Sequence, residues 1–202
     1  MNLPRACTLL VVAALGWSRV GCADPTVWLL EVAPVLLGGG ALLLRWRAFP
    51  WTPLAVLLVT LFSLVLCVGG HWTYAHVPLG EWLREAFGLQ RNHYDRIGHF
   101  LQGVVPALLA RELLLRCTPL RPGKALFWVV ASIALAISAS YELIEWWTTL
   151  LAAPEAGHAF LGSQGDAWDA QWDMALALGG ALAVQVLFGR LHERQIARLA
   201  RP

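Results

Sequence analysis

The chain has 202 residues, of which 58% belong to the apolar and aromatic set AVILMFWYC and only 14% are charged. Soluble domains carry about 25% charged residues, so the composition, with a mean hydropathy of +0.59, excludes an ordinary soluble domain, a disordered chain and a disulfide-rich miniprotein. It favours a protein that crosses a membrane several times, and the net charge of +2 gives no reason to expect a nucleic-acid partner.

Six stretches of the chain are long and apolar enough to predict membrane-spanning helices, since a span needs about 20 mostly apolar residues. We therefore expect an all-α bundle of about six transmembrane helices, built as a single integral membrane domain over residues 1–202 and surrounded by the lipid bilayer. The predicted spans are residues 6–22, 27–45, 51–70, 94–115, 125–149 and 168–189.

The first stretch allows a second interpretation as a cleaved signal peptide. Arg5, a short apolar run and the small residues Gly21 and Ala23 resemble a signal sequence with its cleavage site. Cleavage would leave five spans, with the rest of the topology unchanged. We favour an uncleaved first helix.

Basic residues are distributed unevenly over the connections and predict the orientation of the spans. Arg19, Arg84, Arg91 and Arg96 fall on one side, and the remaining eleven of the fifteen Lys and Arg residues fall on the other. Because cytoplasmic loops carry an excess of positive charge, we expect both termini in the cytoplasm and the connections 71–93 and 151–167 outside. The eleven are Arg5, Arg45, Arg47, Arg111, Arg116, Arg121, Lys124, Arg190, Arg194, Arg198 and Arg201.

The outer boundary of the predicted bundle is rich in aromatic residues. Residues 80–89 are expected to form a short amphipathic helix in the membrane interface. An aromatic belt, which anchors membrane proteins at the headgroup level, is predicted from Trp72, Trp82, Trp146, Trp147, Trp168 and Trp172.

The four cysteines have no metal-ligand spacing, and no disulfide framework is expected.

Acidic side chains from three distant segments converge on this outer boundary. Asp95 and His99 open the fourth span, Glu142 and Glu145 lie near the outer end of the fifth, and Asp169 follows in the sixth. A carboxylate at the centre of a membrane helix costs about 2.5–3.5 kcal/mol, and such groups usually face the protein interior. We therefore expect the three helix faces to meet.

Close carboxylates repel one another unless a cation or shared protons lie between them. Oxygen ligands with one imidazole suit Zn²⁺, Mn²⁺, Mg²⁺ or Fe²⁺, and such a metal can activate a water molecule near neutral pH. Glu145 or Asp166 is then the predicted general base. The predicted metal ligands are Asp95, His99, Glu142, Asp169 and Asp173.

Three other interpretations of these residues stay open. The acids can form a metal-free network with Arg91 and Arg96 in a non-catalytic protein. They can also bind a cation or a proton in a transporter, although the inner halves of the spans are expected to be nearly free of polar groups. Finally, Ser163, His158 and Asp166 are the residue types of a catalytic triad, but no nucleophile elbow is visible.

Three motifs carry a resemblance to a known family. Residues 93–103 (HYDRIGHFLQG), 141–146 (YELIEW) and 160–174 (FLGSQGDAWDAQWDM) resemble the signature of the YjdF-type inner-membrane proteins of bacteria. The resemblance covers most of the chain after Trp28. It implies a six-helix protein in the bacterial inner membrane and assigns no biochemical function.

A second resemblance is to the VanZ-like membrane proteins, and it lacks that family's Asn near the last helix. It implies a function at the cell envelope, where those proteins are linked to glycopeptide resistance. The resemblance gives no reaction. The predicted metal site and this envelope setting together lead us to expect a metal-dependent hydrolase or transferase acting on an envelope lipid or a lipid-linked substrate. The matching positions are Asp95, Arg96, His99, Glu142 and Asp173.

Overall fold

The structure, a computed structural model, describes residues 2–151 and 163–199. Every regular element in these two ranges is helical, which confirms the all-α prediction. Two short turns interrupt the α-helices: a π-helical turn at Val35–Gly39 and a 3-10 turn at Tyr74–His76. The helices are α1 (Leu3–Arg19), α2 (Pro25–Pro34), α3 (Gly40–Arg45), α4 (Pro53–Trp72), α5 (Pro78–Phe87), α6 (Tyr94–Cys117), α7 (Lys124–Leu151) and α9 (Asp169–Leu199).

Four helical stretches of the described chain are long and apolar enough to cross a membrane. The structure therefore supports a membrane protein with several apolar helices and does not confirm the count of six spans. Of the other two expected spans, α1 has only 17 residues and α6 carries charged residues at both ends. The four stretches are Pro25–Arg45, Pro53–Trp72, Lys124–Leu151 and Asp169–Leu199.

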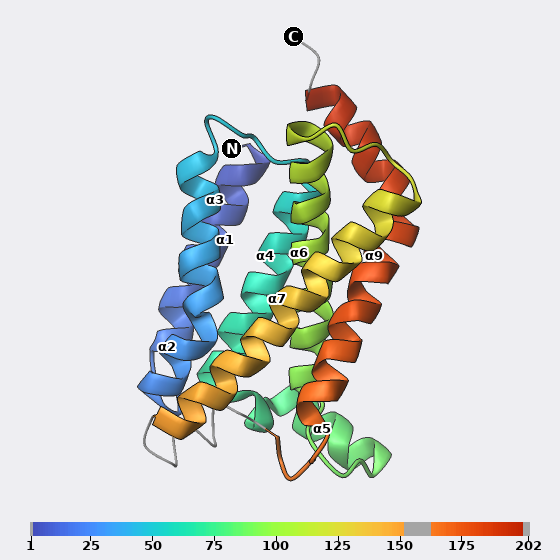
Figure 1. Cartoon of the computed structure of the whole chain (residues 1–202). Coiled ribbons are helices and arrows are strands. Elements are labelled where there is room, and N and C mark those ends of the chain that lie inside the picture. Colours follow the sequence, from blue (N-terminus) through green and yellow to red (C-terminus); the bar gives the residue numbers. More distant parts are fainter. Residues whose placement is uncertain (1, 152–162, 200–202) are drawn as a thin grey trace.

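The helix α6 lies at the centre of the bundle, where it packs against α4, α7 and α9 (Figure 1). The hairpin of α1 with α2 and α3 lies on the other side of α4, and α7 runs obliquely across the bundle. The first turn of α1 and the last turn of α9 share one end, which we call the basic end because it holds most of the arginines. The opposite end is called the α5 end.

Side-chain caps and prolines fix where the N-terminal helices begin. The Asp24 carboxylate accepts hydrogen bonds from the backbone N–H groups of Thr26 and Val27, at 2.7 and 3.0 Å. The Thr52 hydroxyl accepts one from Ala55 at the start of α4. Such caps satisfy N–H groups that have no partner inside the helix, and each is followed by a proline in the first turn, where no N–H is needed.

Two glycines allow α6 and α9 to approach until their backbones touch. A Cβ atom at Gly103 would overlap the backbone of Ala177, and one at Gly180 would overlap the carbonyl group of Phe100. Small residues of this kind permit close packing of membrane helices. The contact fixes the register of α6 against α9, and with it the relative position of their polar ends.

A buried polar network closes the basic end. The Glu112 carboxylate accepts hydrogen bonds from the Thr52 hydroxyl at 2.8 Å, from Arg116 at 2.7 Å and from His192 Nε2 at 3.0 Å. Glu112 and His192 are fully buried. The expectation that the inner halves of the spans are nearly polar-free is therefore wrong at this end. The reason is that α9 continues past residue 189 to Leu199 and brings His192 to Glu112.

The contact between α6 and α9 generates a matched pair of substitutions. Gly180→Ala is expected to lower the free energy of unfolding by about 1–3 kcal/mol, because the new methyl group must push the helices apart. Gly179→Ala is the control, because a Cβ atom at Gly179 meets nothing within 4 Å. Denaturant unfolding in detergent micelles, followed by tryptophan fluorescence, measures both. Equal stability of the two variants would contradict the close contact.

Candidate functional site

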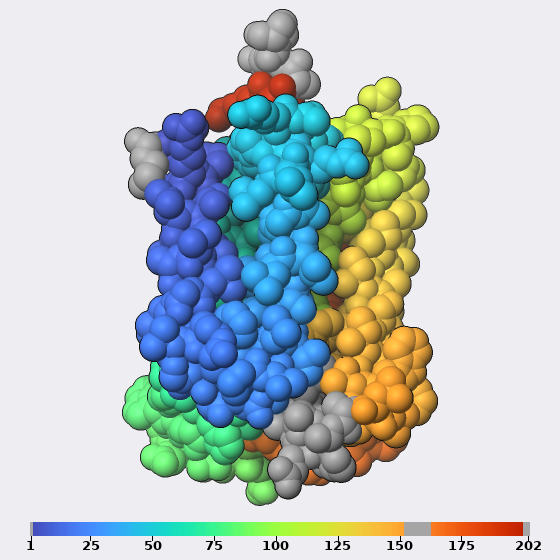
Figure 2. Space-filling view, turned by 90° about the vertical axis from the view of Figure 1, so that its left-hand side faces the viewer, coloured from blue at the N-terminus to red at the C-terminus, as the bar shows by residue number. Residues whose placement is uncertain are grey.

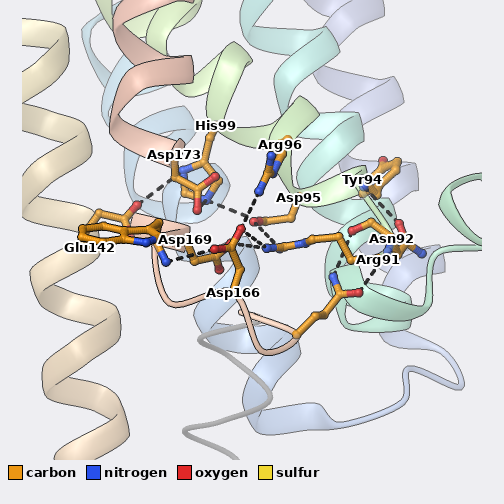
Figure 3. Close-up of polar contacts among 12 residues, drawn as sticks. Arg91, Asn92, Tyr94, Asp95, Arg96, His99, Glu142, Asp166, Asp169 and Asp173 are labelled. Atoms are coloured by element: carbon orange, nitrogen blue, oxygen red, sulfur yellow. Dashed lines mark hydrogen bonds and ion pairs between the residues drawn. The ribbon is translucent and has the colours of Figure 1, made fainter. Parts of the chain in front are cut away.

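Three helices bring acidic residues and one histidine together at the α5 end (Figure 3). Asp95 and His99 lie one turn apart at the start of α6, Glu142 lies toward the end of α7, and Asp173 lies in the second turn of α9. We call these four residues the His99 cluster. The three helix faces that the spacing predicted to meet therefore do so.

The imidazole of His99 lies between two carboxylates. His99 Nε2 is 3.3 Å from Asp95 Oδ1 and 3.9 Å from Asp173 Oδ2. One candidate ligand atom from each of these residues lies within 4.8 Å of the other two. Atoms that each bind Zn²⁺ at about 2.1 Å stand roughly 3.4 Å apart in a tetrahedron. Small side-chain rotations would therefore suffice to place all three around one ion.

The other ring nitrogen of His99 faces an amide oxygen. His99 Nδ1 is 2.9 Å from Gln102 Oε1, one turn further along α6, and 3.6 Å from Glu142 Oε1. The Gln102 oxygen can only accept, so the contact is a hydrogen bond in the tautomer that carries its proton on Nδ1. The lone pair of a neutral imidazole at Nε2 then points at two carboxylates. That arrangement calls for a cation or a further proton between them.

Two carboxylate oxygens of the His99 cluster have no hydrogen-bond donor. Asp173 Oδ1 and Glu142 Oε1 are buried, and neither has a hydrogen-bond partner among the described residues. Burying a charged oxygen without a partner is costly, and native proteins leave few such groups unexplained. The cluster therefore has more acceptors than the described part of the chain supplies donors for.

A layer of arginines lies beside the His99 cluster, and we call it the Arg91 layer: Arg91, Arg96, Asp166 and Asp169. The Arg91 guanidinium pairs closely with Asp169, lies 3.6 Å from Asp166 and reaches to 4.0 Å from Asp95. Arg96 binds Asp166 at 2.9 Å. Asp166 also caps α9 by accepting from the backbone N–H of Trp168. The structure thus places two predicted site residues, Asp166 and Asp169, against arginines rather than against His99.

Two further acids are buried near the His99 cluster. Glu145, a predicted general base, lies one turn after Glu142, is 7% exposed and feels the charges of Glu142 and His99. Glu31 on α2 is equally buried and feels the charges of Asp95 and His99. Sequence analysis did not single out Glu31. Its signal was available, because a lone acid inside an apolar span indicates a functional position.

Asn92 connects the site to the neighbouring segments and was also missed. Its side chain donates to the carbonyl of Val77 at 3.0 Å, accepts from the backbone N–H of Tyr94 at 3.0 Å and is fully buried. Its backbone exchanges two hydrogen bonds with the side-chain amide of Gln164, at 3.0 and 2.9 Å. No sequence motif marks this role, because every partner comes from another segment.

Partial burial, together with the charges of Arg96 and Arg91, lowers the pKa of His93, which precedes α6. The cations of the Arg91 layer therefore dominate the local field on that side. The predicted combination of Ser163, His158 and Asp166 is not tested, because His158 lies outside the described residues.

Tryptophans surround the α5 end on the outside. The Trp172 ring lies against the guanidinium of Arg96, 5.5 Å from its centroid, so the aromatic ring reaches the edge of the site. Trp72 instead packs inward against Trp17 and His71. The amphipathic helix predicted at 80–89 is largely α5, Pro78–Phe87. The tryptophans with exposed side chains include Trp17, Trp82, Trp146, Trp147, Trp168 and Trp172, and Trp128 at the start of α7 is exposed as well.

Comparisons with known proteins agree with the membrane assignment. Residues 3–194 match the family described as "Predicted membrane protein (DUF2238)". The chain is also 47% identical to "Inner membrane protein YjdF" of Escherichia coli (strain K12) over 190 residues, which cover 94% of this chain and 90% of that protein. No solved structure gives a significant match.

The Arg91 layer generates a prediction about stability. Arg91→Gln is expected to lower the free energy of unfolding by about 3–5 kcal/mol, because it leaves buried carboxylates without their cation. Arg84→Gln removes an arginine from an exposed pair with Glu81 and is expected to cost less than about 1 kcal/mol. Thermal unfolding of the purified variants, followed by tryptophan fluorescence, measures the difference. Equal losses would show that Arg91 does not neutralise the site.

Proposed function

This chain belongs to the DUF2238 family of predicted membrane proteins, and we propose that it holds a divalent metal ion in the His99 cluster. The observation that carries the proposal is the grouping of Asp95, His99 and Asp173, with ligand atoms within 4.8 Å of one another. The unpartnered oxygens of Asp173 and Glu142 support it, because a cation would satisfy both.

The residues divide into ligands and positioning groups. Asp95, His99, Asp173 and Glu142 are the proposed ligands, a set of oxygens with one imidazole that suits Zn²⁺, Mn²⁺ or Mg²⁺. Gln102 holds the His99 ring by accepting from Nδ1, as partners of metal-binding histidines usually do. We assign Asp169 and Asp166 to positioning, because both pair with arginines.

The chemistry we propose is hydrolysis or group transfer. A divalent metal makes a bound water nucleophilic near neutral pH. Glu145 is the proposed general base, because it is buried on α7 one turn from Glu142 and feels the charges of Glu142 and His99. Exposed tryptophans such as Trp172 flank the site, which favours an amphipathic substrate from the envelope, such as a lipid or a lipid-linked molecule.

Ion or proton transport uses the same acids but needs a polar path through the bundle. Between Gln102 and Arg111, the helix α6 carries only apolar residues. That stretch of eight residues is roughly 12 Å long, and most of it is buried against α4, α7 and α9. An apolar stretch of this length on the central helix favours metal-dependent chemistry at one end over conduction.

We also propose that α1 and α6 cross the membrane, which gives six spans with both termini in the cytoplasm. With 17 residues, α1 reaches the lower limit for a span. The charges of α6 lie at its two ends and are paired there, by Arg91 at one end and by Arg116 and His192 at the other. The basic end then faces the cytoplasm.

The metal proposal is tested by metal content. The full-length protein, purified in detergent, is expected to hold about one divalent metal per chain by elemental mass spectrometry. The double variant Asp95→Asn, Asp173→Asn is expected to lose it. Glu85→Gln is the matched control, because Glu85 is an exposed acid on α5 at the same end. A chelator is expected to lower the unfolding temperature of the wild type and of the control only.

The outcomes separate the interpretations. Loss of metal from a double variant that still unfolds cooperatively supports a metal centre and excludes a purely structural network. Absence of metal from the wild type after loading with Zn²⁺, Mn²⁺ and Mg²⁺ in turn would overturn the proposal and leave a charge network as the role of the cluster.

The topology is tested by reporter fusions after Leu199. A fluorescent protein that folds only in the cytoplasm is expected to fluoresce when fused after Leu199. A phosphatase that is active only in the periplasm is expected to be inactive at the same fusion site. The same phosphatase fused after Leu89 is expected to be active, because α5 lies at the opposite end of the bundle. The reverse pattern would place the basic end outside.

A further inference from the structure

A lateral cavity of about 250 Å³ lies between α1, α3 and α4. No residue of the His99 cluster lines it, and most of its lining on α3 and α4 lies in the half of the bundle nearer the basic end. Its walls are almost entirely apolar, and the lining hydroxyls of Thr60 and Ser63 are already bonded to carbonyl groups of their own helix. The lining includes Cys7, Val11, Leu43, Trp46, Ala55 and Val59.

The cavity exists because α1 and α3 diverge. The helix α1 packs along α4 and meets α2 near the α5 end. Figure 2 shows the gap between α1 and α3 widening toward the basic end, with deeper residues visible in it. The π-helical turn at Val35–Gly39 follows Pro34 and separates α2 from α3, and such turns commonly bend a helix. The opening therefore faces the side of the bundle, where lipid tails lie in a membrane.

The chain around this opening is positively charged. Arg5 at the start of α1, Arg45 at the end of α3 and Arg47 just after it are all exposed. No acidic residue occurs before Asp24 or from Val32 to Gly80. Trp46 and Trp51 line the cavity at the same level, and tryptophans prefer the depth of the lipid headgroups.

We propose that this cavity binds one acyl chain of an anionic phospholipid whose phosphate group contacts Arg5, Arg45 and Arg47. The volume is below the roughly 300–1,000 Å³ of pockets that enclose a whole small ligand, so it suits part of a single chain. Basic sites between membrane helices are recognised binders of anionic headgroups. A second copy of this chain is a poorer occupant, because a symmetric contact would bring two arginine clusters together.

The test is a lipid titration of the full-length protein in a non-ionic detergent, read by native mass spectrometry. Phosphatidylglycerol is the anionic probe and phosphatidylcholine the zwitterionic one. The wild type is expected to hold one phosphatidylglycerol and to prefer it over phosphatidylcholine. Arg45→Gln with Arg47→Gln is expected to weaken phosphatidylglycerol binding roughly thirtyfold and to remove the preference.

A pair of neighbouring glycines tests the cavity itself. Gly40 lines it, and a Cβ atom there meets nothing within 4 Å, so Gly40→Leu is expected to fill the space and abolish lipid retention. Gly38→Leu is the control, because Gly38 is equally unobstructed but does not line the cavity. Retention of the lipid by Gly40→Leu, equal binding of the two lipids by the wild type, or a lipid-free dimer would each overturn the proposal.

Discussion

Contact between the backbones of α6 and α9 is the constraint on which both polar clusters depend. Gly103 and Gly180 remove the side chains that would hold the two helices apart. At the α5 end this brings His99 of α6 beside Asp173 of α9. At the basic end it brings Glu112 beside His192. The close pair of α6 and α9 therefore sets the geometry at both ends. The segments of α4 and α7 add single residues to clusters whose positions this pair has already determined.

The two clusters differ in how well their charges are satisfied. Glu112 accepts from a hydroxyl, an arginine and a histidine, so its carboxylate is fully occupied. The His99 cluster surrounds one imidazole with three carboxylates and leaves two buried oxygens without a donor from residues 2–151 and 163–199. A satisfied buried network holds helices together, whereas an under-satisfied one calls for a ligand. This contrast within a single chain is the physical basis for our proposal of a ligand site at one end and a supporting network at the other.

The exposed surface of the protein also differs between the α5 end and the basic end. Exposed tryptophans and the amphipathic α5 surround the His99 cluster, while arginines and an apolar cavity mark the basic end. Trp172 and Arg96 extend the aromatic surface to the edge of the site. The proposed metal centre lies at the α5 end of α6, whereas the proposed lipid site lies beside α1, α3 and α4 and reaches Leu109 in the apolar stretch of α6. Neither proposal depends on the other. A bound lipid would affect the protein by anchoring it in the membrane.

The sequence by itself determined the helical class, the apolar stretches and the convergence of acids, because hydropathy and helical spacing are local properties of the chain. It also predicted that Asp95, His99, Glu142 and Asp173 share one depth. Only the tertiary structure decided which acids face His99 and which face Arg91, since that depends on how α6, α7 and α9 are rotated about their axes. The contacts of Asn92, and the closing of the basic end by His192, were equally out of reach of sequence. Each arises from a contact between residues distant in the chain, and local patterns carry no record of such contacts.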